Sequence, residues 1–433
     1  MFEEFAPSIL SRQALDKKFM KIYLVGGAVR DKALNIPVRE RDWVVVGASA
    51  SEMLENGYRA VGKDFPVYLH PDSGEEYALA RTERKTRPGY TGFDFFADPS
   101  VTLEQDLSRR DLTINAMAMD DDGNIVDPFH GLDDLEHRLL RHVSPAFCED
   151  PVRILRVARF AARYHCLGFR VADDTMALMR EMVASGEVDS LVPERVWKEF
   201  SRALGESAPD QFVLVLRQCG ALAKILPELD ALFGVEQPAH YHPEIDTGVH
   251  SLMSLQQAAR WTEDVAVRFA ALTHDLGKGL TPKHLLPSHH GHEVAGLPLL
   301  KQLCDRIKVP NECRDLARLV MEFHTHCHRA FALKGSTLNS LLKKLDARRQ
   351  YQRFNHYLLA CKADACGRTG FESRNYPQAN YLLLAFALTQ EITNRSVLDE
   401  GFSGAAVGEE IERRQIARLN ELVKRTKSPI PDV

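Results

Sequence analysis

The sequence predicts an α+β protein in which an α/β head is followed by a remainder made only of helices. Residues 20–140 alternate short β-rich runs with turn residues and helical stretches. From about residue 145 onward, apolar residues recur at helical spacing and strand-like runs almost disappear. A chain of 433 residues is also too long for one compact domain, so more than one activity is expected.

The composition excludes several classes of protein. With 45% hydrophobic and 27% charged residues, the chain can build a sizeable core, which excludes general disorder. The net charge of −5 gives no overall sign of nucleic-acid binding, so a basic surface for nucleic acid is expected only as a local patch. The eight cysteines form no CxxC pair, which favours reduced thiols and a cytoplasmic location. Residues 1–19 lack the pattern of a signal peptide, and no apolar run is long enough to span a bilayer, so no membrane partner is expected.

The first predicted strand runs directly into a pair of glycines. Residues 21–25 (KIYLV) form an apolar strand pattern, Gly26 and Gly27 follow, and a helical pattern starts at residue 28. A glycine pair at such a turn lets backbone N–H groups approach a phosphate, and the helix N-terminus adds a favourable dipole. Arg30, one turn into the helix, is expected to reach the same phosphates. Taken alone, such a turn is usually only structural, so a phosphate site is predicted only in combination with the next motif of the chain.

An acidic pair precedes the next predicted strand. Glu40 and Asp42 flank Arg41, and residues 43–46 (WVVV) form an apolar run. Side chains two residues apart on a strand share one face, so both carboxylates are expected to project together. Magnesium, a hard cation that prefers oxygen ligands, would neutralise them. The sequence therefore predicts an Mg²⁺ site at Glu40 and Asp42 with Glu76 as an acidic neighbour, and the alternative is a pair of solvated charges.

Three strings resemble the motifs of a known enzyme class. Residues 24–31 (LVGGAVRD), followed by the acidic pair, resemble the polymerase-β-like nucleotidyltransferase superfamily. Residues 106–116 (DLSRRDLTINA) and 149–160 (EDPVRILRVARF) are similar to motifs of bacterial tRNA nucleotidyltransferases and poly(A) polymerases. The resemblance to HD-containing bacterial CCA-adding enzymes extends from about residue 20 to near the C-terminus. It implies a polymerase-β-like head and addition of C, C and A to the 3′ end of tRNA without a nucleic-acid template, using CTP and ATP.

The second of these long strings also has a physical interpretation. Asp150 and Pro151 form a good helix start, because Asp accepts from first-turn N–H groups and Pro suits the first helical position. Arginines then recur every three or four residues, and between residues 138 and 170 seven arginines stand against two acids. Guanidinium groups suit phosphates and base edges. A basic face for nucleotide or RNA is therefore predicted on this helix.

The resemblance assigns individual residues to the nucleotide pocket. Asp150 and Arg153 match the pair that offers donors and acceptors to the incoming base in place of a template. Cytosine and adenine both carry an exocyclic amino group beside a ring acceptor, so one such pair serves both bases. The residues expected to bind nucleotide are Gly27, Arg30, Arg110, Asp150, Arg153, Arg156 and Arg159.

Supporting residues are implied as well. Asp111 is expected to position Arg110 or Arg156 through an ion pair, and Arg195 is expected to brace the pocket. The family usually has Asp-x-Asp where this chain has Glu40-Arg41-Asp42, a departure that makes the geometry at Glu40 less constrained. Glu40 and Asp42 are nevertheless the expected catalytic metal ligands.

Most of the 17 histidines lie between residues 240 and 328. Residues 265–279 (VAVRFAALTHDLGKG) close a helical pattern with His274 and Asp275 and resemble the HD phosphohydrolase superfamily. A nitrogen and an oxygen ligand side by side suit a transition metal, with Ni²⁺ favoured and Mn²⁺ or Co²⁺ as alternatives. The family pattern implies an upstream histidine and a distal aspartate, which His250 and Asp364 fit, and His292 is a further candidate.

Three further histidines lie near the end of this region, and the resemblance also implies an activity for it. His324, His326 and His328 are not expected to be direct ligands. The resemblance implies 2′,3′-cyclic phosphodiesterase, 2′-nucleotidase and phosphatase activities at RNA ends, with a metal-activated water as nucleophile. The alternatives are a surface histidine cluster or an HD domain kept only as a scaffold.

These patterns predict the organisation and partners of the chain. The parts are an N-terminal extension, the head, a neck and body, an HD domain and a helical tail, at residues 1–19, 20–143, 144–246, 247–349 and 350–433. The expected partners are ATP, CTP and a tRNA acceptor stem gripped through phosphates and shape, by a monomer or a homodimer. Three alternatives remain open: a poly(A) polymerase, an HD phosphohydrolase with a degenerate head, and a non-catalytic RNA-binding scaffold.

Overall fold

The computed structural model describes residues 20–38, 40–61, 67–85 and 93–427, so the predicted extension 1–19 lies outside the described residues. Backbone contacts divide the chain into two compact units, residues 1–196 with 218–221, and residues 197–217 with 222–433. The first unit contains a sheet and the second is helical, which confirms the predicted α+β class. The predicted boundaries near residues 143, 246 and 349 are finer than this division and stay predictions.

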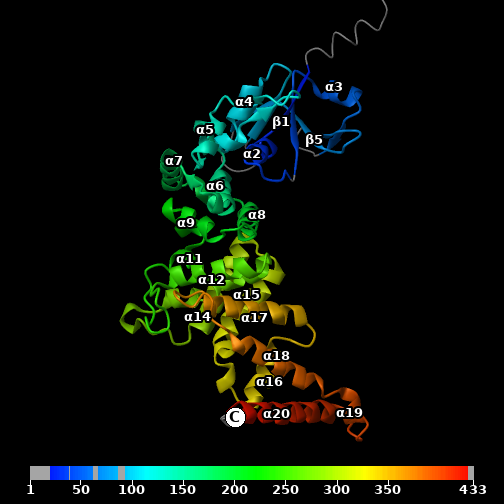
Figure 1. Ribbon diagram of the computed structural model, residues 1–433, viewed down its shortest axis with the longest axis vertical. Coiled ribbons are helices and arrows are strands. Elements are labelled where there is room, and N and C mark those ends of the chain that lie inside the picture. Colours follow the sequence, from blue (N-terminus) through cyan, green and yellow to red (C-terminus); the bar gives the residue numbers. More distant parts are fainter. Residues whose placement is uncertain (1–19, 39, 62–66, 86–92, 428–433) are drawn as a thin grey trace, which may run out of the picture. The chain divides into compact units, whose positions relative to one another are not determined.

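A seven-stranded sheet with the order β3-β4-β5-β2-β1-β8-β9 forms the core of the head (Figure 1). Its strands are β1 Lys21–Val25, β2 Asp42–Val46, β3 Arg59–Val61, β4 Val67–Leu69, β5 Glu76–Leu79, β8 Ala118–Met119 and β9 Ile125–Val126. Within it, β2 and β5 pair in parallel and the other neighbours pair antiparallel. Two further pairs are β6 Arg81–Lys85 with β7 Phe93–Ala97, and β10 Leu139–Leu140 with β11 Arg170–Val171. The strands predicted for the head are confirmed.

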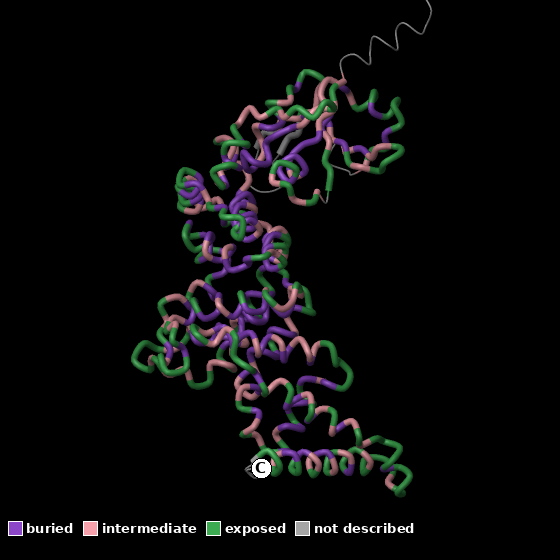
Figure 2. The backbone as a smooth tube through the Cα atoms, in the orientation of Figure 1, coloured by how far each residue is buried: buried purple, intermediate pink, exposed green. Residues whose placement is uncertain are grey.

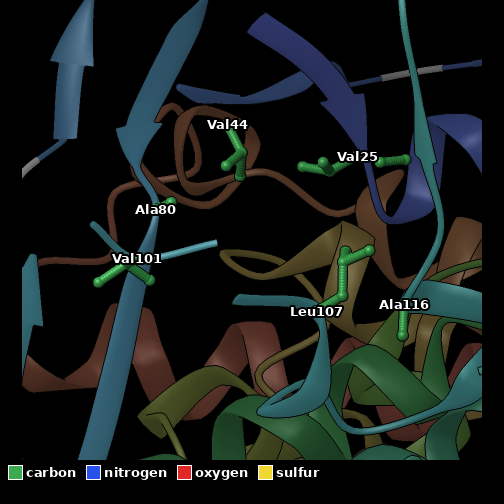
Figure 3. Packing of buried hydrophobic residues seen from close by; sticks show 7 residues of the cluster. Val25, Val44, Ala80, Val101, Leu107 and Ala116 are labelled. Atoms are coloured by element: carbon green, nitrogen blue, oxygen red, sulfur yellow. The ribbon is translucent and has the colours of Figure 1, made fainter. Parts of the chain in front are cut away.

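Alternation along the strands buries both faces of this sheet. Val25 and Val44 belong to one buried cluster, together with Leu107 (Figure 3). Val45, the next residue on β2, belongs to a second cluster that includes Met53 of a surface helix. Because β-branched side chains suit a pleated surface, the VVV run makes β2 a well-anchored central strand. The carboxylate at the start of β2 is therefore carried by a rigid element.

Helices complete the first unit. They are α2 Gly27–Ala33, α3 Ala50–Glu55, α4 Leu103–Ser108, α5 Gly131–Glu136, α6 Val152–Tyr164 and α7 Asp173–Ala184, while α8 Pro193–Leu204 crosses from the first unit into the second. α6 begins directly after Pro151, and the Asp150 carboxylate accepts a hydrogen bond from the Val152 N–H at 3.1 Å. The predicted helix start is thereby confirmed.

The second unit is built from helices throughout the described part of its chain. They are α9 Asp210–Gln218, α10 Ala221–Ile225, α11 Pro227–Asp230, α12 Thr247–Trp261, α13 Val265–Thr273, α14 His292–Ile307, α15 Asn311–His328, α16 Gly335–Lys344, α17 Tyr351–Cys366, α18 Pro377–Gln390, α19 Asn394–Leu398 and α20 Ala405–Lys427. α12, α13, α15 and α17 pack against one another and are largely buried (Figure 2). α16, α18 and α20 pack together as a second group. None of the described helices is long and apolar enough to cross a membrane.

Candidate functional site

A sharp turn links the first strand of the head to its first helix. β1 ends at Val25, Gly26 has a positive φ of 67°, and α2 begins at Gly27. A Cβ atom built on Gly26 would lie 2.7 Å from Nη1 of Arg110. Without a side chain at this position, the guanidinium lies directly against the backbone of the turn. The predicted strand, glycine turn and helix are confirmed, and the structure brings Arg110 to them.

Replacing Gly26 with Ala is expected to lower kcat/KM for nucleotide addition by roughly tenfold to a hundredfold. A positive φ costs an L-residue about 1–2 kcal/mol, and the new methyl group would displace Arg110 from the turn. Gly123→Ala is the matched control, because Gly123 has a φ of 85° and no atom within 4 Å of its ideal Cβ position. Equal kinetics for the two variants, at comparable melting temperatures, would contradict a role for the close contact at Gly26.

The register of the sheet places Asp42 beside this turn. Asp42 lies opposite Val25, the residue before Gly26, in the pairing of β2 with β1. In the parallel pairing of β2 with β5, it lies opposite Glu76. Neighbouring atoms displace enough water to raise the pKa of the Asp42 carboxyl, the charge of Arg110 opposes this rise, and the charge of Glu40 adds to it. A carboxylate disfavoured by a second acid is one that a bound cation stabilises.

Glu40 is an exposed residue just outside the strand. β2 begins at Asp42, so the alternation of strand side chains does not determine where Glu40 points, and that part of the sequence argument does not hold. Its charge nevertheless acts on Asp42. Glu40 and Asp42, with Glu76 opposite Asp42 in register, offer the carboxylate oxygens that a divalent cation prefers as ligands.

Arg30 is buried rather than presented to solvent, with an exposed fraction of 4%. Its Nε and Nη2 atoms donate to Oδ1 of Asp31 at 2.9 and 2.7 Å, and Nη1 donates to the side-chain oxygen of Asn115. The guanidinium also lies 5.4 Å from the ring centroid of Phe160 and 5.1 Å from that of Tyr164. Its donors are thus directed at the protein, and in this arrangement Arg30 connects the helix after the glycine turn to α6.

The arginine face of α6 is held by buried acids. Nε of Arg156 donates to Oδ2 of Asp111 at 2.6 Å, which is one of the two ion pairs predicted for Asp111. Burial alone would raise the pKa of Asp111, but the charge of Arg156 and further hydrogen bonds hold it well below its usual value. The guanidinium of Arg159 lies 4.4 Å from the ring centroid of Phe160. The basic face therefore consists of arginines with fixed positions.

Both residues expected to read the base already have protein partners. Nη2 and Nη1 of Arg195 donate to the Asp150 carboxylate at 2.7 and 3.2 Å, so the predicted bracing contact of Arg195 is confirmed. Nη1 of Arg153 donates to the backbone carbonyl of Ala146 at 2.9 Å, and its Nη2 donates to the carbonyl of Arg109. Asp150 and Arg153 thus lie one helical turn apart in defined orientations at the start of α6.

Two residues within the long strings were not singled out by the sequence analysis. Asn115 accepts from Arg30 and donates from Nδ2 to Oδ1 of Asp111 at 2.9 Å. Asp106 is fully buried and lies 3.3 Å from Nη2 of Arg110. Burial raises the pKa of Asp106, but the charges of Arg110 and of the arginine before it outweigh that effect and lower it. Both residues belong to the string at 106–116, so the motif itself was the available signal.

The four residues predicted for the HD site come together from three helices. His250 lies on α12, His274 and Asp275 follow α13, and Asp364 lies on α17. Nε2 of His250 lies 3.1 Å from Oδ1 of Asp364, and Nε2 of His274 lies 3.1 Å from Oδ2 of Asp275 and 3.7 Å from Asp364. All four are almost completely buried.

Backbone carbonyls orient the two histidines. Nδ1 of His274 donates to the carbonyl of Ala271 at 2.8 Å, and Nδ1 of His250 donates to the carbonyl of Gly367 at 3.0 Å. Each Nε2 is thereby left as the atom that faces the carboxylates. In metal-binding histidines, a hydrogen bond from the ring nitrogen that does not bind the metal fixes the tautomer of the imidazole in this way.

Two further histidines extend the cluster. Nε2 of His292 lies 3.2 Å from Oδ1 of Asp275, in agreement with its candidacy. Nε2 of His324 lies 3.7 Å from the same oxygen, and His324 shares possible ligand groups with both aspartates of the site. α15 thus carries His324 into the cluster, a position that the sequence did not predict, and the expectation that His324 is not a direct ligand stays a prediction. Burial lowers the pKa of His324 to about 3, which keeps its imidazole neutral.

His328 takes part differently. Its Nε2 lies 2.5 Å from Oδ2 of Asp364, and its Nδ1 lies 2.8 Å from the Tyr376 hydroxyl. It thus contacts a predicted ligand without belonging to the groups of side chains arranged to hold an ion. Lys278, within the HDLGK string, lies 2.6 Å from Oδ2 of Asp275.

The electrostatics of the cluster fit a cation. Burial disfavours the charged form of Asp275 and Asp364, yet neighbouring histidines hold the pKa of both far below the usual value, and the charge of Lys278 adds to this effect at Asp275. Nε2 of His274 and both carboxylate oxygens of Asp275 are buried, and their close contacts with one another, with Lys278 and with His292 do not have hydrogen-bond geometry. Buried polar atoms are rarely left without a well-formed hydrogen bond, so these atoms are suited to hold an ion.

Known protein families match the segments of the chain that carry most of these candidate residues. Residues 22–141 match the model of the poly A polymerase head domain, and residues 247–363 match the HD domain model. Residues 168–233 match a model described as "Probable RNA and SrmB- binding site of polymerase A".

Curated relatives and solved structures extend over nearly the whole chain. The multifunctional CCA protein of Thioalkalivibrio sulfidiphilus is 63% identical over 403 residues, covering 93% of this chain and 98% of the relative. That of Teredinibacter turnerae is 59% identical, covering 95% of this chain and 100% of the relative. The fold is also that of the Thermotoga maritima CCA-adding enzyme complexed with tRNA, at 20% identity and a TM-score of 0.62 over 98% of this chain and 96% of the other. The Bacillus stearothermophilus CCA-adding enzyme in complex with CTP matches at 22% identity and a TM-score of 0.62, covering 95% and 91%.

The glycine turn and Asp42 lie within the segment that matches the poly A polymerase head domain, and His250, His274 and Asp275 lie within the segment that matches the HD domain. The chain belongs to the family of multifunctional CCA proteins, as a CCA-adding tRNA nucleotidyltransferase that also carries an HD phosphohydrolase domain.

Proposed function

We propose that the head adds C, C and A in order to the 3′ end of tRNA, using CTP and ATP and releasing pyrophosphate. The observation that carries this proposal is the contact between α6 and α2, the helix that follows the glycine turn. The Tyr164 hydroxyl on α6 donates to Oδ1 of Asp31 on α2 at 3.2 Å, and the Arg30 guanidinium lies 5.4 and 5.1 Å from the ring centroids of Phe160 and Tyr164. A phosphate turn and a base-selecting helix that touch each other can serve the two ends of one nucleotide.

Glu40 and Asp42 would hold Mg²⁺ at the edge of the sheet. When bound there, the ion supplies charge neutralisation for the triphosphate and for the attacking 3′-hydroxyl of tRNA. Arg110 lies against the backbone of Gly26 and its charge acts on Asp42, so its guanidinium would bind phosphate next to this ion. Gly27 leaves the start of α2 free of side-chain bulk. The head thereby orients the triphosphate for in-line displacement.

Base selection is assigned to Asp150 and Arg153, with Arg156 and Arg159 lining the pocket. Asp150 offers acceptors and Arg153 offers donors, a set that matches the amino group and the ring acceptor of cytosine or adenine. Arg195 keeps the Asp150 carboxylate oriented. Selectivity then depends on side chains alone, and a nucleic-acid template is not required.

The direct test uses tRNA that ends at the discriminator base, incubated with CTP and ATP. The expected product is tRNA extended by three nucleotides in the order C, C, A, resolved on a sequencing gel. A long A-tail would instead establish the poly(A) polymerase alternative. No extension at all would support a head that has lost catalysis.

The two expected metal ligands can be separated by substitution at Glu40. Glu40→Asp is expected to keep addition within about an order of magnitude, because the carboxylate is retained. Glu40→Ala is expected to lower kcat by about a hundredfold or more. The measurement is single-turnover incorporation of CMP as a function of Mg²⁺ concentration. An active Glu40→Ala variant with an unchanged Mg²⁺ dependence would remove Glu40 from the site.

The HD cluster is assigned to the repair of tRNA ends, as a 2′,3′-cyclic phosphodiesterase, 2′-nucleotidase and phosphatase. His250, His274, Asp275 and Asp364 would hold a transition metal, and Ni²⁺ is favoured over Mn²⁺ and Co²⁺ for this mixed nitrogen and oxygen set. When bound, the ion lowers the pKa of a water molecule to supply the nucleophile. Such an activity clears a blocked 3′ end before the head extends it. We place the enzyme in the cytoplasm, where tRNA is processed.

A further inference from the structure

A cavity of about 340 Å³ lies between α16, α18 and α20, within the second unit and apart from the HD cluster. Its walls come from Asn339 on α16, Phe386 and Thr389 on α18, and Gln415 on α20, and its rim includes the turn after α16. Its volume is at the small end of the range of about 300–1,000 Å³ for sites that hold small molecules. A single nucleotide is of the right size.

The inner wall of this cavity offers an unused hydrogen-bond donor. Asn339 has an exposed fraction of 2%, and its Nδ2 makes no hydrogen bond within the described chain. Buried amide donors in proteins are nearly always paired, so an unpaired one that lines a cavity indicates a ligand with an acceptor atom.

Two glutamine amides line the cavity near Asn339. Nε2 of Gln415 donates to the carbonyl of Thr389 at 3.3 Å, and Nε2 of Gln390 donates to the Thr389 hydroxyl at 3.1 Å. These bonds orient both amides and leave their carbonyl oxygens as the atoms suited to accept. Asn and Gln amides pair a donor with an acceptor, which is the pattern of a nucleobase edge.

The rest of the lining suits the other parts of a nucleotide. Phe386 gives the wall an aromatic surface, and its ring is held by stacking on Tyr351 at a centroid distance of 5.4 Å. At the rim, Lys343 pairs with Glu412 and Arg349 pairs with Asp346. Arg348, by contrast, is exposed and makes no ion pair or hydrogen bond with any residue that the structure describes. One guanidinium is thus left for an anionic group at the mouth of an apolar and amide-lined cavity.

We propose that this cavity binds one unpaired nucleotide of the tRNA, with its base against Asn339 and Gln415 and its phosphate at Arg348. Unpaired RNA bases are recognised by amide contacts to their edges and by packing on aromatic side chains. A bare phosphate would leave the amides and Phe386 unused. The proposal rests on tRNA being the substrate, and it adds a contact to a part of the RNA away from the reacting 3′ end.

The test compares Arg348→Glu and Asn339→Leu in the full chain with Arg395→Glu as the control. Arg395 is also exposed, lies on α19 outside the cavity, and undergoes the same change of charge. Binding of tRNA that lacks its terminal CCA is measured by fluorescence anisotropy. Arg348→Glu is expected to raise Kd by about tenfold and Asn339→Leu by about fivefold, while Arg395→Glu changes it by less than about twofold. Melting temperatures confirm that the Asn339 variant is folded.

Chemical probing of the bound tRNA gives the second measurement. One unpaired nucleotide is expected to be protected by the wild-type protein and to become reactive again with Asn339→Leu. If both cavity variants bind like the control, or if no nucleotide depends on Asn339, the proposal is overturned. Titration with AMP, CMP, GMP and UMP distinguishes a free nucleotide from a nucleotide of the tRNA as the occupant. If a free nucleotide binds in a way that depends on Asn339 while the variants leave tRNA affinity unchanged, RNA is overturned as the occupant.

Failure of this inference is distinguishable from failure of the proposed function. The wild-type protein is assayed for addition of C, C and A in the same preparation. An overturned inference leaves that addition intact, whereas an overturned function removes it. At saturating tRNA, the kcat of Arg348→Glu is expected to equal that of the wild type, because Arg348 lies outside the catalytic machinery of the head.

Discussion

Replacing Asp42 with Asn is expected to lower the rate of CMP and AMP incorporation by about three orders of magnitude. The carboxylate lies at the first position of a central strand, opposite the residue that precedes the glycine turn. An amide of the same shape keeps the fold but loses the charge that gathers a cation, while Arg110 keeps its positive charge beside the turn. Single-turnover extension of tRNA by radiolabelled CTP measures the effect.

Two controls make the outcome at Asp42 specific. Asp122→Asn changes an exposed acid in the turn between β8 and β9 and is expected to leave addition unchanged. Hydrolysis of a 2′,3′-cyclic phosphate by the Asp42→Asn protein should equal that of the wild type. Undiminished nucleotide incorporation by Asp42→Asn would refute the metal site in the head.

Replacing His274 with Ala is expected to remove cyclic-phosphate hydrolysis by at least about a hundredfold and to leave nucleotide addition intact. His274 is almost completely buried, its Nδ1 is held by a backbone carbonyl, and its Nε2 faces two carboxylates. Loss of this nitrogen also leaves Asp275 with less opposing charge, because the charge of His274 is the chief influence that holds its pKa down against burial. The assay is release of the 2′- or 3′-phosphate product from a cyclic nucleotide.

Metal content distinguishes a lost ligand from a general structural defect at His274. The wild-type protein, stripped with a chelator and reloaded, is expected to retain a transition metal, and His274→Ala is expected to retain much less, as measured by plasma mass spectrometry. His284→Ala, an exposed histidine of the same unit, is the matched control. Hydrolysis retained by His274→Ala would show that the cluster is not the hydrolytic site.

Most of the fold could be predicted because its elements carry strong local patterns. The apolar run at residues 43–46 and the arginine helix at 152–164 appear where periodicity and capping put them. The pairing of β2 with β1 and β5 could not be predicted in the same way. It depends on contacts between residues distant in sequence, and only this register shows that Asp42 lies beside the glycine turn and Glu76.

The residues of the candidate sites also fall into those with a local sequence signal and those placed by contacts between distant parts of the chain. Residues within a contiguous motif, such as His274 and Asp275, could be named from the sequence. The position of His324 could not, because an isolated histidine on a helix has no local signal, and only the packing of α15 against α13 brings it to Asp275. Arg30 was expected to face a phosphate. The acids and aromatic rings that surround its guanidinium come together only in the folded chain, so the sequence could not show that it is buried.

The buried guanidinium of Arg30 has one more implication. It is shared by the helix after the glycine turn and by the helix that carries the base-reading pair, through Asp31, Phe160 and Tyr164. Under the proposed function, the two recognition tasks are therefore physically linked. A substitution on α6 that alters base selection is therefore expected to disturb the glycine turn as well. A change of nucleotide specificity would then need compensating substitutions on both α2 and α6.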